Sequence, residues 1–255
     1  MKKFALLVMT AAVVCSCDFS SLLNRIIRGD GTATEVSYEL GAFAGIASVG
    51  SVDVIYTPSS GPQSVVLTCD ENLVDYYDIV IERGILTIST KRGYIVRPKI
   101  ETFVTVTAPP IYGVSITGSG DCVVKGDLPL QDDAKFLSTG SGDLVMTGTV
   151  TCKNIEVKTT GSGDIQLDGV MAEEATFSSF GSGDLAAGRL SAETISMSFA
   201  GSGDGAFRCE DAGDITVRIS GSGDVTLSGN ARTLQSKVSG SGKVDSYYLA
   251  LSGGR

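Results

Sequence analysis

The sequence predicts an all-β protein that folds as a single-stranded, right-handed β-helix (β-solenoid), with coils of about 20 residues and a glycine-rich corner in each coil. Three observations predict this fold. The tetrapeptide GSGD occurs six times, and a seventh copy reads GSGK, at steps of 22, 21, 20, 20, 20 and 19 residues. The segments between the copies alternate apolar and polar residues with the period of two that strands require. Beyond the first seventeen residues, no helical period is longer than the single turn expected at "ENLVDYY" (71–77).

Residues 1–17 read as a secretory signal. Lys2 and Lys3 precede an apolar run that is too short to span a membrane as a helix. The run ends in "VCSC", which resembles the lipobox of bacterial lipoproteins, in which the final cysteine receives the lipid. We therefore expect Cys17 to be the lipid-attachment residue, and a lipid there would hold the chain at a membrane. The alternative is ordinary signal-peptidase cleavage, with Cys17 an incidental thiol.

The composition restricts the classes of function. The chain has 20 Lys+Arg and 29 Asp+Glu, so loss of Lys2 and Lys3 with the signal leaves 18 against 29, a net charge of −11. Such a polyanion is a poor partner for nucleic acid. There is no histidine and no tryptophan, which removes the commonest general base and the best sugar-stacking ring. The four later cysteines match no metal-binding spacing, and Cys122 stands where other repeats carry Leu, Ile or Val.

Two segments lie between the signal and the repeats. Residues 18–37 are expected to be a tether. Residues 38–117 form a β-rich N-terminal part, with strands expected at 51–57, 64–69, 78–82, 85–90 and 102–108. The phrase "VGSVDVIYT" (49–57) looks like a decayed copy of the later repeat, so we expect this part to be continuous with the solenoid.

Residues 118–250 form the GSGD-repeat solenoid. When the first glycine of each copy is position zero, position four is usually apolar: it holds Cys122, Leu144, Ile165, Leu185, Gly205 and Val225. Strands of four to six residues at about 3.3 Å per residue, with their corners, account for a coil of about 20 residues. A propeller blade needs about 40 residues and fits this period less well. A β-sandwich is the other all-β alternative.

The repeated aspartates are candidate ligands as well as candidate corner residues. Stacked coils would place these six carboxylates above one another: Asp121, Asp143, Asp164, Asp184, Asp204 and Asp224. Charges about 4.8 Å apart repel by about 3.5 kcal/mol at an effective dielectric constant of 20, so the column needs compensation. The preferred interpretation is a structural corner that accepts turn N–H groups and needs no cofactor. The alternative is a shared Ca²⁺. Lys243 replaces the final aspartate and would cap the column's charge.

The spaced GSGD phrase, the sequence "GSVDVIYT" and the lipoprotein signal together resemble a family of bacterial envelope proteins, common in Bacteroidetes, labelled auto-transporter adhesins with a head GIN domain. The resemblance covers about residues 40–250. It implies a β-helical fold, an exported and often lipid-anchored chain, and a role in adhesion. It implies no catalytic residues.

The function expected is therefore that of a non-enzymatic, lipid-anchored protein of the cell envelope, located in the outer membrane, whose solenoid faces bind a glycan or a cell-surface protein. The tyrosines weighed as sugar platforms, against core or cap roles, are Tyr76, Tyr77, Tyr94, Tyr247 and Tyr248. One alternative is a polysaccharide-active β-helix enzyme. Its basic groups would be Arg189, Arg208, Arg218 and Arg232, which occupy different repeat positions and form no stacked row. The other alternative is a periplasmic structural or sensing protein without an external ligand.

Overall fold

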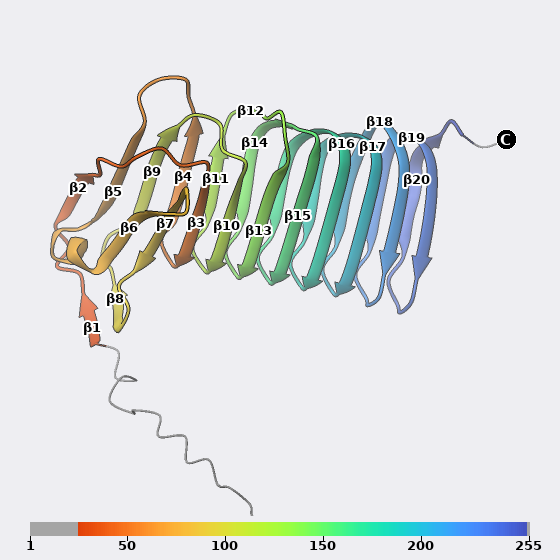
Figure 1. The fold of residues 1–255 in the computed structure, drawn as a ribbon. Helices are drawn as coiled ribbons and strands as arrows, with labels where there is room; N and C mark the ends of the chain where they lie inside the picture. Colours follow the sequence, from red (N-terminus) through yellow and green to blue (C-terminus); the bar gives the residue numbers. More distant parts are fainter. Residues whose placement is uncertain (1–24, 254–255) are drawn as a thin grey trace, which may run out of the picture.

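The computed structural model describes residues 25–253 and shows one elongated stack of β-coils (Figure 1). The expected signal peptide and Cys17 lie outside the described residues. Successive strands behind the stack run upward and those in front run downward as the chain advances, which gives the coils a right-handed sense (Figure 1). The predicted β-solenoid is confirmed. No helix in residues 25–253 is long and apolar enough to cross a membrane.

Thirteen strands make up the coils. From β16 onward one strand of 14–17 residues runs from one corner to the next, except for the final strand of 8. The strands are β3 (Gly45–Gly50), β4 (Asp53–Pro58), β10 (Gly113–Gly118), β11 (Cys122–Lys125), β12 (Leu128–Pro129), β13 (Ala134–Gly140), β14 (Leu144–Thr151), β15 (Asn154–Gly161), β16 (Ile165–Gly181), β17 (Leu185–Gly201), β18 (Gly205–Ile219), β19 (Val225–Val238) and β20 (Val244–Leu251).

The coils are held in register by parallel pairing at equivalent positions. Gly118 pairs with Gly140 and Gly161 pairs with Gly181, so the corners stack directly. The same register reaches back to the decayed copy, because Gly50 pairs with Gly118 in the β3–β10 ladder. Strand β4 likewise pairs with β11. The N-terminal part is therefore continuous with the repeats through hydrogen-bonded strands.

The N-terminal end of the stack is closed by strands that double back. Antiparallel pairing joins β2 to β5, β5 to β9 and β6 to β7, whereas β7 and β9 pair in parallel with the first coil. The bounds are β2 (Ala33–Ser37), β5 (Ser64–Asp70), β6 (Tyr77–Glu82), β7 (Ile85–Thr90) and β9 (Phe103–Ala108), with a 3₁₀ helix, η2 (Glu71–Tyr76), at the expected helical turn. The five strands expected in this part are confirmed as β4, β5, β6, β7 and β9.

Part of the segment expected to be a tether is folded. Within 18–37, β1 (Arg25–Arg28) pairs with β8 (Tyr94–Arg97), and β2 adds to the edge of β5. The fully buried carboxylate of Asp70 ties this segment down by accepting the backbone N–H of Gly31 at 2.6 Å and that of Lys99 at 2.9 Å. Both β1 and β2 are edge strands, and a strand at the edge of a sheet needs few apolar residues. The polar composition of 25–37 therefore suggested a linker.

The core consists of apolar ladders inside the coils. Phe136, Phe177 and Phe199 are among the largest fully buried side chains. A buried hydroxyl two residues before several corners donates to the carbonyl of the corner's second glycine, as Ser179 does to Gly183 at 2.7 Å. The corner's inward carbonyl is thereby satisfied, and the coils stay closely packed.

Candidate functional site

The repeated aspartates form one column along the corner of the stack. The structure brings together all six residues singled out in the sequence and adds Asp53 from the decayed copy. Each Oδ1 accepts the backbone N–H of the next residue in the column at 2.7–2.8 Å, from Asp53 through to Asp224. The bonded N–H belongs to the next coil rather than to the carboxylate's own turn. The column therefore fastens coil to coil as well as shaping each corner.

The two ends of the column differ electrically. At the first end, burial raises the pKa of Asp53, and the neighbouring carboxylates of Asp121 and Glu101 raise it further. At the other end, Lys243 donates its backbone N–H to Asp224 Oδ1 at 3.0 Å, and its Nζ lies 3.6 Å from Asp224 Oδ2. Lys243 thus supplies the final backbone donor and also, as the sequence suggested, a positive charge at the end of the column.

The column offers limited coordination for a cation. In residues 25–253, no group of three or more acidic or cysteine side chains is arranged to hold a metal ion. Ca²⁺ takes six to eight oxygen ligands, and one oxygen of each column carboxylate already accepts an N–H. Calcium binding by the column stays a prediction, which a calcium titration monitored by the thermal unfolding midpoint would test.

The corner glycines are required by the close approach of successive coils. Gly181 has φ +142°, and a Cβ there would lie 2.2 Å from the carbonyl oxygen of Gly161. Gly183 is equally close to the carbonyl oxygen of Gly163. A side chain at either glycine of the corner would therefore push two coils apart. The serine between them donates its backbone N–H to the preceding corner, as Ser182 does to Gly161 at 2.7 Å.

A groove crosses the front face of the stack beside Tyr112. Two adjoining hollows of about 420 and 260 Å³ share Tyr112 and Lys135 in their walls. Tyr112 is 45% exposed, and its Cζ and hydroxyl oxygen lie 3.2 and 3.3 Å from the place where a Cβ of Gly45 would be. The ring therefore covers the bare backbone of Gly45 and remains partly open to solvent.

The two hollows differ in character. The smaller one is lined mainly by apolar and small residues such as Ile85 and Ala47. The larger one is lined by Asp133, Asn154, Glu156, Glu174 and Thr176, and Lys135 forms an ion pair with Glu156 there. The side chain of Tyr112 thus adjoins a row of hydrogen-bonding groups that extends across the next three coils. This is the arrangement by which a pocket with an apolar floor and a few polar groups orients a ligand.

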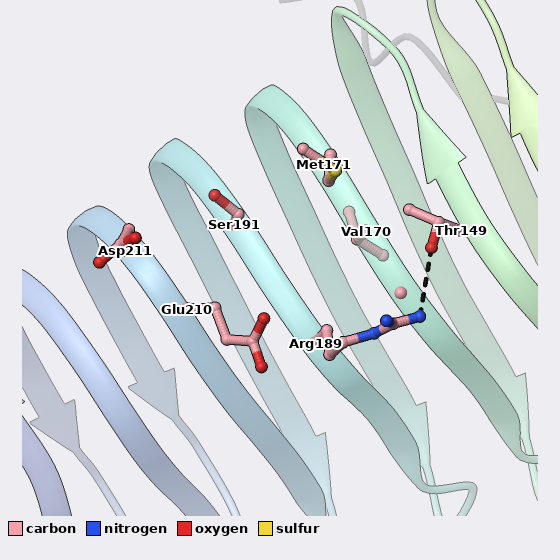
Figure 2. Close-up of a pocket in the computed structure, with 8 residues that line it drawn as sticks. Thr149, Val170, Met171, Arg189, Ser191, Glu210 and Asp211 are labelled. Carbon is pink, nitrogen blue, oxygen red and sulfur yellow. Dashed lines mark hydrogen bonds between the residues drawn. The ribbon is translucent and has the colours of Figure 1, made fainter.

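A second groove, of about 260 Å³, lies at the bends between strands (Figure 2). Arg189 extends along it and donates to Thr149 Oγ1 at 3.4 Å, while Met171 is 54% exposed on the neighbouring coil. Glu210 comes from the next coil and forms an ion pair with Arg208 rather than with Arg189. The groove holds one cation and two carboxylates, with no nucleophile–base pair in hydrogen-bonding contact among its lining residues.

The structure separates the tyrosines that the sequence suggested. Tyr77 is buried, and Tyr76 packs edge-on against Tyr94 with ring centroids 4.9 Å apart, so these three belong to the N-terminal cap. Tyr247 and Tyr248 are 84% and 75% exposed at the far end. Tyr112 was missed by the sequence reasoning. It follows Pro109 and Pro110 in a loop, outside any alternating strand, so the only sequence signal for an exposed side chain was its position after the two prolines.

The arginines form no common site. Arg189 lies on β17, Arg208 and Arg218 lie on β18, and Arg232 lies on β19, at different positions of the repeat, so they form no stacked row, as the sequence predicted. The four described cysteines are buried and unpaired. Burial raises the pKa of Cys122 to about 12 and those of Cys69, Cys152 and Cys209 to about 11. They are core thiols of low reactivity, as expected for Cys122.

Comparison with known proteins places the chain by its sequence. The family model described as "Putative auto-transporter adhesin, head GIN domain" matches residues 42–211 and 203–252. No curated protein matches the chain.

Several solved structures share the fold. A "putative adhesin" from Bacteroides fragilis is 24% identical, with a TM-score of 0.78 over 86% of this chain and 99% of its own. A "putative lipid binding protein" from Parabacteroides distasonis is 22% identical, with a TM-score of 0.73 over 87% and 99%. A "putative adhesin" from Parabacteroides merdae is 22% identical, with a TM-score of 0.66 over 87% and 98%. At this level of identity the likeness shows a shared fold.

Proposed function

The chain belongs to the family described as "Putative auto-transporter adhesin, head GIN domain", and from that premise we propose that it is a non-enzymatic adhesin anchored in the outer membrane by a lipid on Cys17. Its ligand is an uncharged oligosaccharide, bound in the groove beside Tyr112 (the Tyr112 groove). The observation that carries this proposal is the combination, in one groove, of an open aromatic ring with a row of polar side chains.

The chemistry of the groove favours a sugar. A tyrosine ring offers an apolar face together with a polar tip. The carboxylates beside it can accept hydrogen bonds from sugar hydroxyl groups, and the Asn154 amide can both donate and accept them, at several points along a chain of sugars. Asp133, Glu156 and Glu174 outnumber Lys135 in the larger hollow. An acidic polysaccharide would therefore be repelled, whereas an uncharged one would not.

The non-enzymatic assignment rests on what the polar groups of the stack already do. The column carboxylates are engaged in holding neighbouring coils together. The sequence contains no histidine. Repeats also vary by only three residues in length, whereas a catalytic site on such a scaffold usually brings a long functional loop.

Two measurements test the proposal at separate points. Protease shaving and antibody labelling of intact cells test the location: digestion of the solenoid on whole cells supports a surface adhesin. Complete protection until the outer membrane is opened would refute the adhesin and favour the periplasmic role. Replacing Cys17 with Ser should abolish metabolic labelling with a fatty acid. Continued labelling would contradict attachment at Cys17.

Binding to an array of neutral and sulfated oligosaccharides tests the ligand. Tyr112→Ala should lower binding to the best neutral glycan at least tenfold, because the stacking surface is lost. Phe180→Ala is the matched control, since Phe180 is an exposed aromatic (42%) farther along the same face. Equal losses in both variants, or preference for sulfated glycans, would overturn the assignment of the Tyr112 groove.

A further inference from the structure

Within residues 25–253, the last coil of the stack comprises half of the usual circuit. Strand β20 pairs with the first half of β19, from Val225↔Val244 to Ala231↔Leu251. The second half of β19, residues 233–238, pairs with β18 on one side. Within residues 25–253 no strand pairs with its other side, and the end of the stack therefore has a step. We call residues 233–238 the open strand.

The step exposes positions that are internal in every preceding coil. Leu234 and Val238 continue the ladders of Ile215 and Ile219, which are 1% and 2% exposed, but Val238 is 40% exposed. On the raised half of the step, Tyr247 and Leu251 are also exposed. At the opposite end, by contrast, the inward residues of the doubled-back strands are buried, as Leu67 of β5 is (0% exposed). An unpaired strand edge over an exposed apolar end is a template for association.

We propose that the stepped end docks on the stepped end of a second copy of this chain. A two-fold axis parallel to the strands turns the partner so that its β20 lies over the open strand, while β20 of the first copy lies over the partner's open strand. Strands on the two faces run in opposite directions (Figure 1). Each new pair is therefore antiparallel, with β-ladder hydrogen bonds. A single extended peptide would fill one recess and leave the other edge open, whereas a second copy fills both and closes the assembly.

The charges of the last coil fit this arrangement. Residues 225–253 carry Arg232, Lys237, Lys243 and Asp245. Arg232 binds Asp214 through two hydrogen bonds of 2.8 and 3.0 Å, and Lys243 lies against Asp224. Lys237 on the open strand and Asp245 on β20 make no ion pair within the described residues. These two remaining charges lie on opposite halves of the step and have opposite signs.

One register satisfies the side chains together. With Lys237 opposite the partner's Asp245, antiparallel pairing also sets Val238 opposite the partner's Val244 and Ser236 opposite the partner's Ser246. Valine thus faces valine, serine faces serine, and lysine faces aspartate, and cross-strand pairs of these kinds stabilise a sheet.

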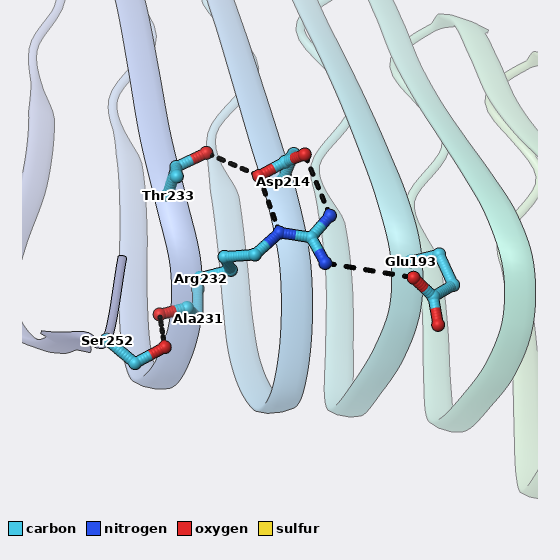
Figure 3. A network of polar contacts seen from close by, with 6 residues as sticks. All are labelled: Glu193, Asp214, Ala231, Arg232, Thr233 and Ser252. Atoms are coloured by element: carbon cyan, nitrogen blue, oxygen red, sulfur yellow. Dashed lines mark hydrogen bonds and ion pairs between the residues drawn. The ribbon is translucent and has the colours of Figure 1, made fainter. Parts of the chain in front are cut away.

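The open strand is also held in place before any partner binds (Figure 3). The Arg232 guanidinium bridges Asp214 and Glu193 of the two preceding coils, at 2.8 Å to Asp214 Oδ2 and 3.8 Å to Glu193 Oε2. Thr233, the first residue of the open strand, donates its hydroxyl to Asp214 Oδ1 at 2.7 Å. An edge that is already ordered loses less conformational entropy on association.

Sedimentation equilibrium of the full chain carrying Cys17→Ser, which excludes association through lipid, tests the proposal. We expect a monomer–dimer equilibrium and no larger species. Lys237→Glu or Asp245→Lys alone should raise the dissociation constant of the dimer at least tenfold, because each places like charges opposite one another in both of the new strand pairs. The double variant exchanges the two charges and should restore the dimer. Lys158→Glu, on the same face but far from the step, is the control and should change nothing.

Backbone pairing has its own test. Ser236→Pro removes an N–H from the exposed edge and should abolish the dimer while far-ultraviolet circular dichroism remains that of the folded solenoid. A monomer at all concentrations up to 100 μM, filaments, a dimer indifferent to the Lys237 and Ser236 variants, or failure of the charge exchange to rescue would each overturn the proposal. So would a monomer whose open-strand amides become protected from hydrogen exchange only when a different envelope component is added.

Discussion

Gly205 and Phe199 give the most direct test of how the coils are packed. Position four of the repeat holds an apolar side chain in the other five GSGD coils, but in the coil that begins at Gly201 it is Gly205. A Cβ at Gly205 would lie 2.6 Å from Phe199 Cζ and 2.9 Å from Phe207 Cε2. In the preceding coil the equivalent pair is Ser179 and Leu185. One coil thus has a small residue before the corner and a large one after it, and the next coil reverses the order.

The magnitudes follow from this exchange of volume. Gly205→Leu forces four heavy atoms into the space of the Phe199 ring, at an overpacking cost of about 1–3 kcal/mol. The backbone of Gly205 has no positive φ, so it should accept leucine without conformational strain. Phe199→Ser empties a buried site, which costs about 3–5 kcal/mol, as for Phe→Ala substitutions. The double variant recreates the Ser179–Leu185 pair, so the two changes should be coupled by about 2–3 kcal/mol.

Urea unfolding followed by far-ultraviolet circular dichroism gives the four free energies of unfolding. The double variant should be more stable than the sum of the single changes predicts, and more stable than Phe199→Ser alone. Phe136 is fully buried three coils before Phe199, so combining Phe136→Ser with Gly205→Leu is the additive control. Additivity within about 0.5 kcal/mol for the Phe199–Gly205 pair would refute the packing argument.

Three further predictions concern the corner and the cap. Asp204→Ala should lower the free energy of unfolding by about 0.5–1.5 kcal/mol in urea melts, because the N–H of Asp224 loses its acceptor; Asp204→Asn keeps an oxygen and should be nearly neutral, and equal losses would instead indicate that the negative charge matters. Gly181→Ala should cost about 2–5 kcal/mol through strain and overlap, whereas Gly41→Ala, with open space and no positive φ, should cost almost nothing in the same melts. Burial alone would raise the pKa of Asp70, but hydrogen bonds from three backbone N–H groups outweigh the burial and lower that pKa. The ionised Asp70 carboxylate therefore stabilises the folded chain at pH values above the ordinary aspartate range, and this stabilisation is lost as the pH falls below that range. As the pH is lowered across that range, the urea concentration at the unfolding midpoint should fall less steeply for Asp70→Asn than for the unaltered chain. Parallel plots of midpoint against pH would contradict this role of Asp70.

The repeat made most of the fold predictable from the sequence. A fixed step between corners sets the coil length, and equal position sets the register, so the column of aspartates could be placed before any coordinates. The partner of each carboxylate could not. Whether Asp204 Oδ1 meets an amide of its own turn or that of Asp224 depends on the lateral offset between coils, which no sequence period encodes.

Features that occur once were the hardest to predict. Tyr112 follows two prolines outside any alternating strand, and its exposure depends on Gly45 lying under the ring, 67 residues earlier in the chain. The folding of residues 25–37 depends on Asp70, whose burial could not be inferred from an acidic residue at the end of a strand. Both are long-range contacts between non-repeating residues, so periodicity carries no information about them.

The Tyr112 groove lies where the repeat departs most from its average. The two longest steps, 22 and 21 residues, begin at Gly118 and Gly140, and later steps are 20 or 19. One extra residue of the first of these coils falls in the link before β13, which brings Asp133 to the wall of the groove, and the extra residue of the second coil forms the bulge in β14 between Met146 and Thr149. From β16 onward each coil is one nearly continuous strand, and its front face carries fewer irregularities. The irregular early coils therefore carry the Tyr112 groove, whereas the described part of the stack ends in the unpaired edge of the open strand.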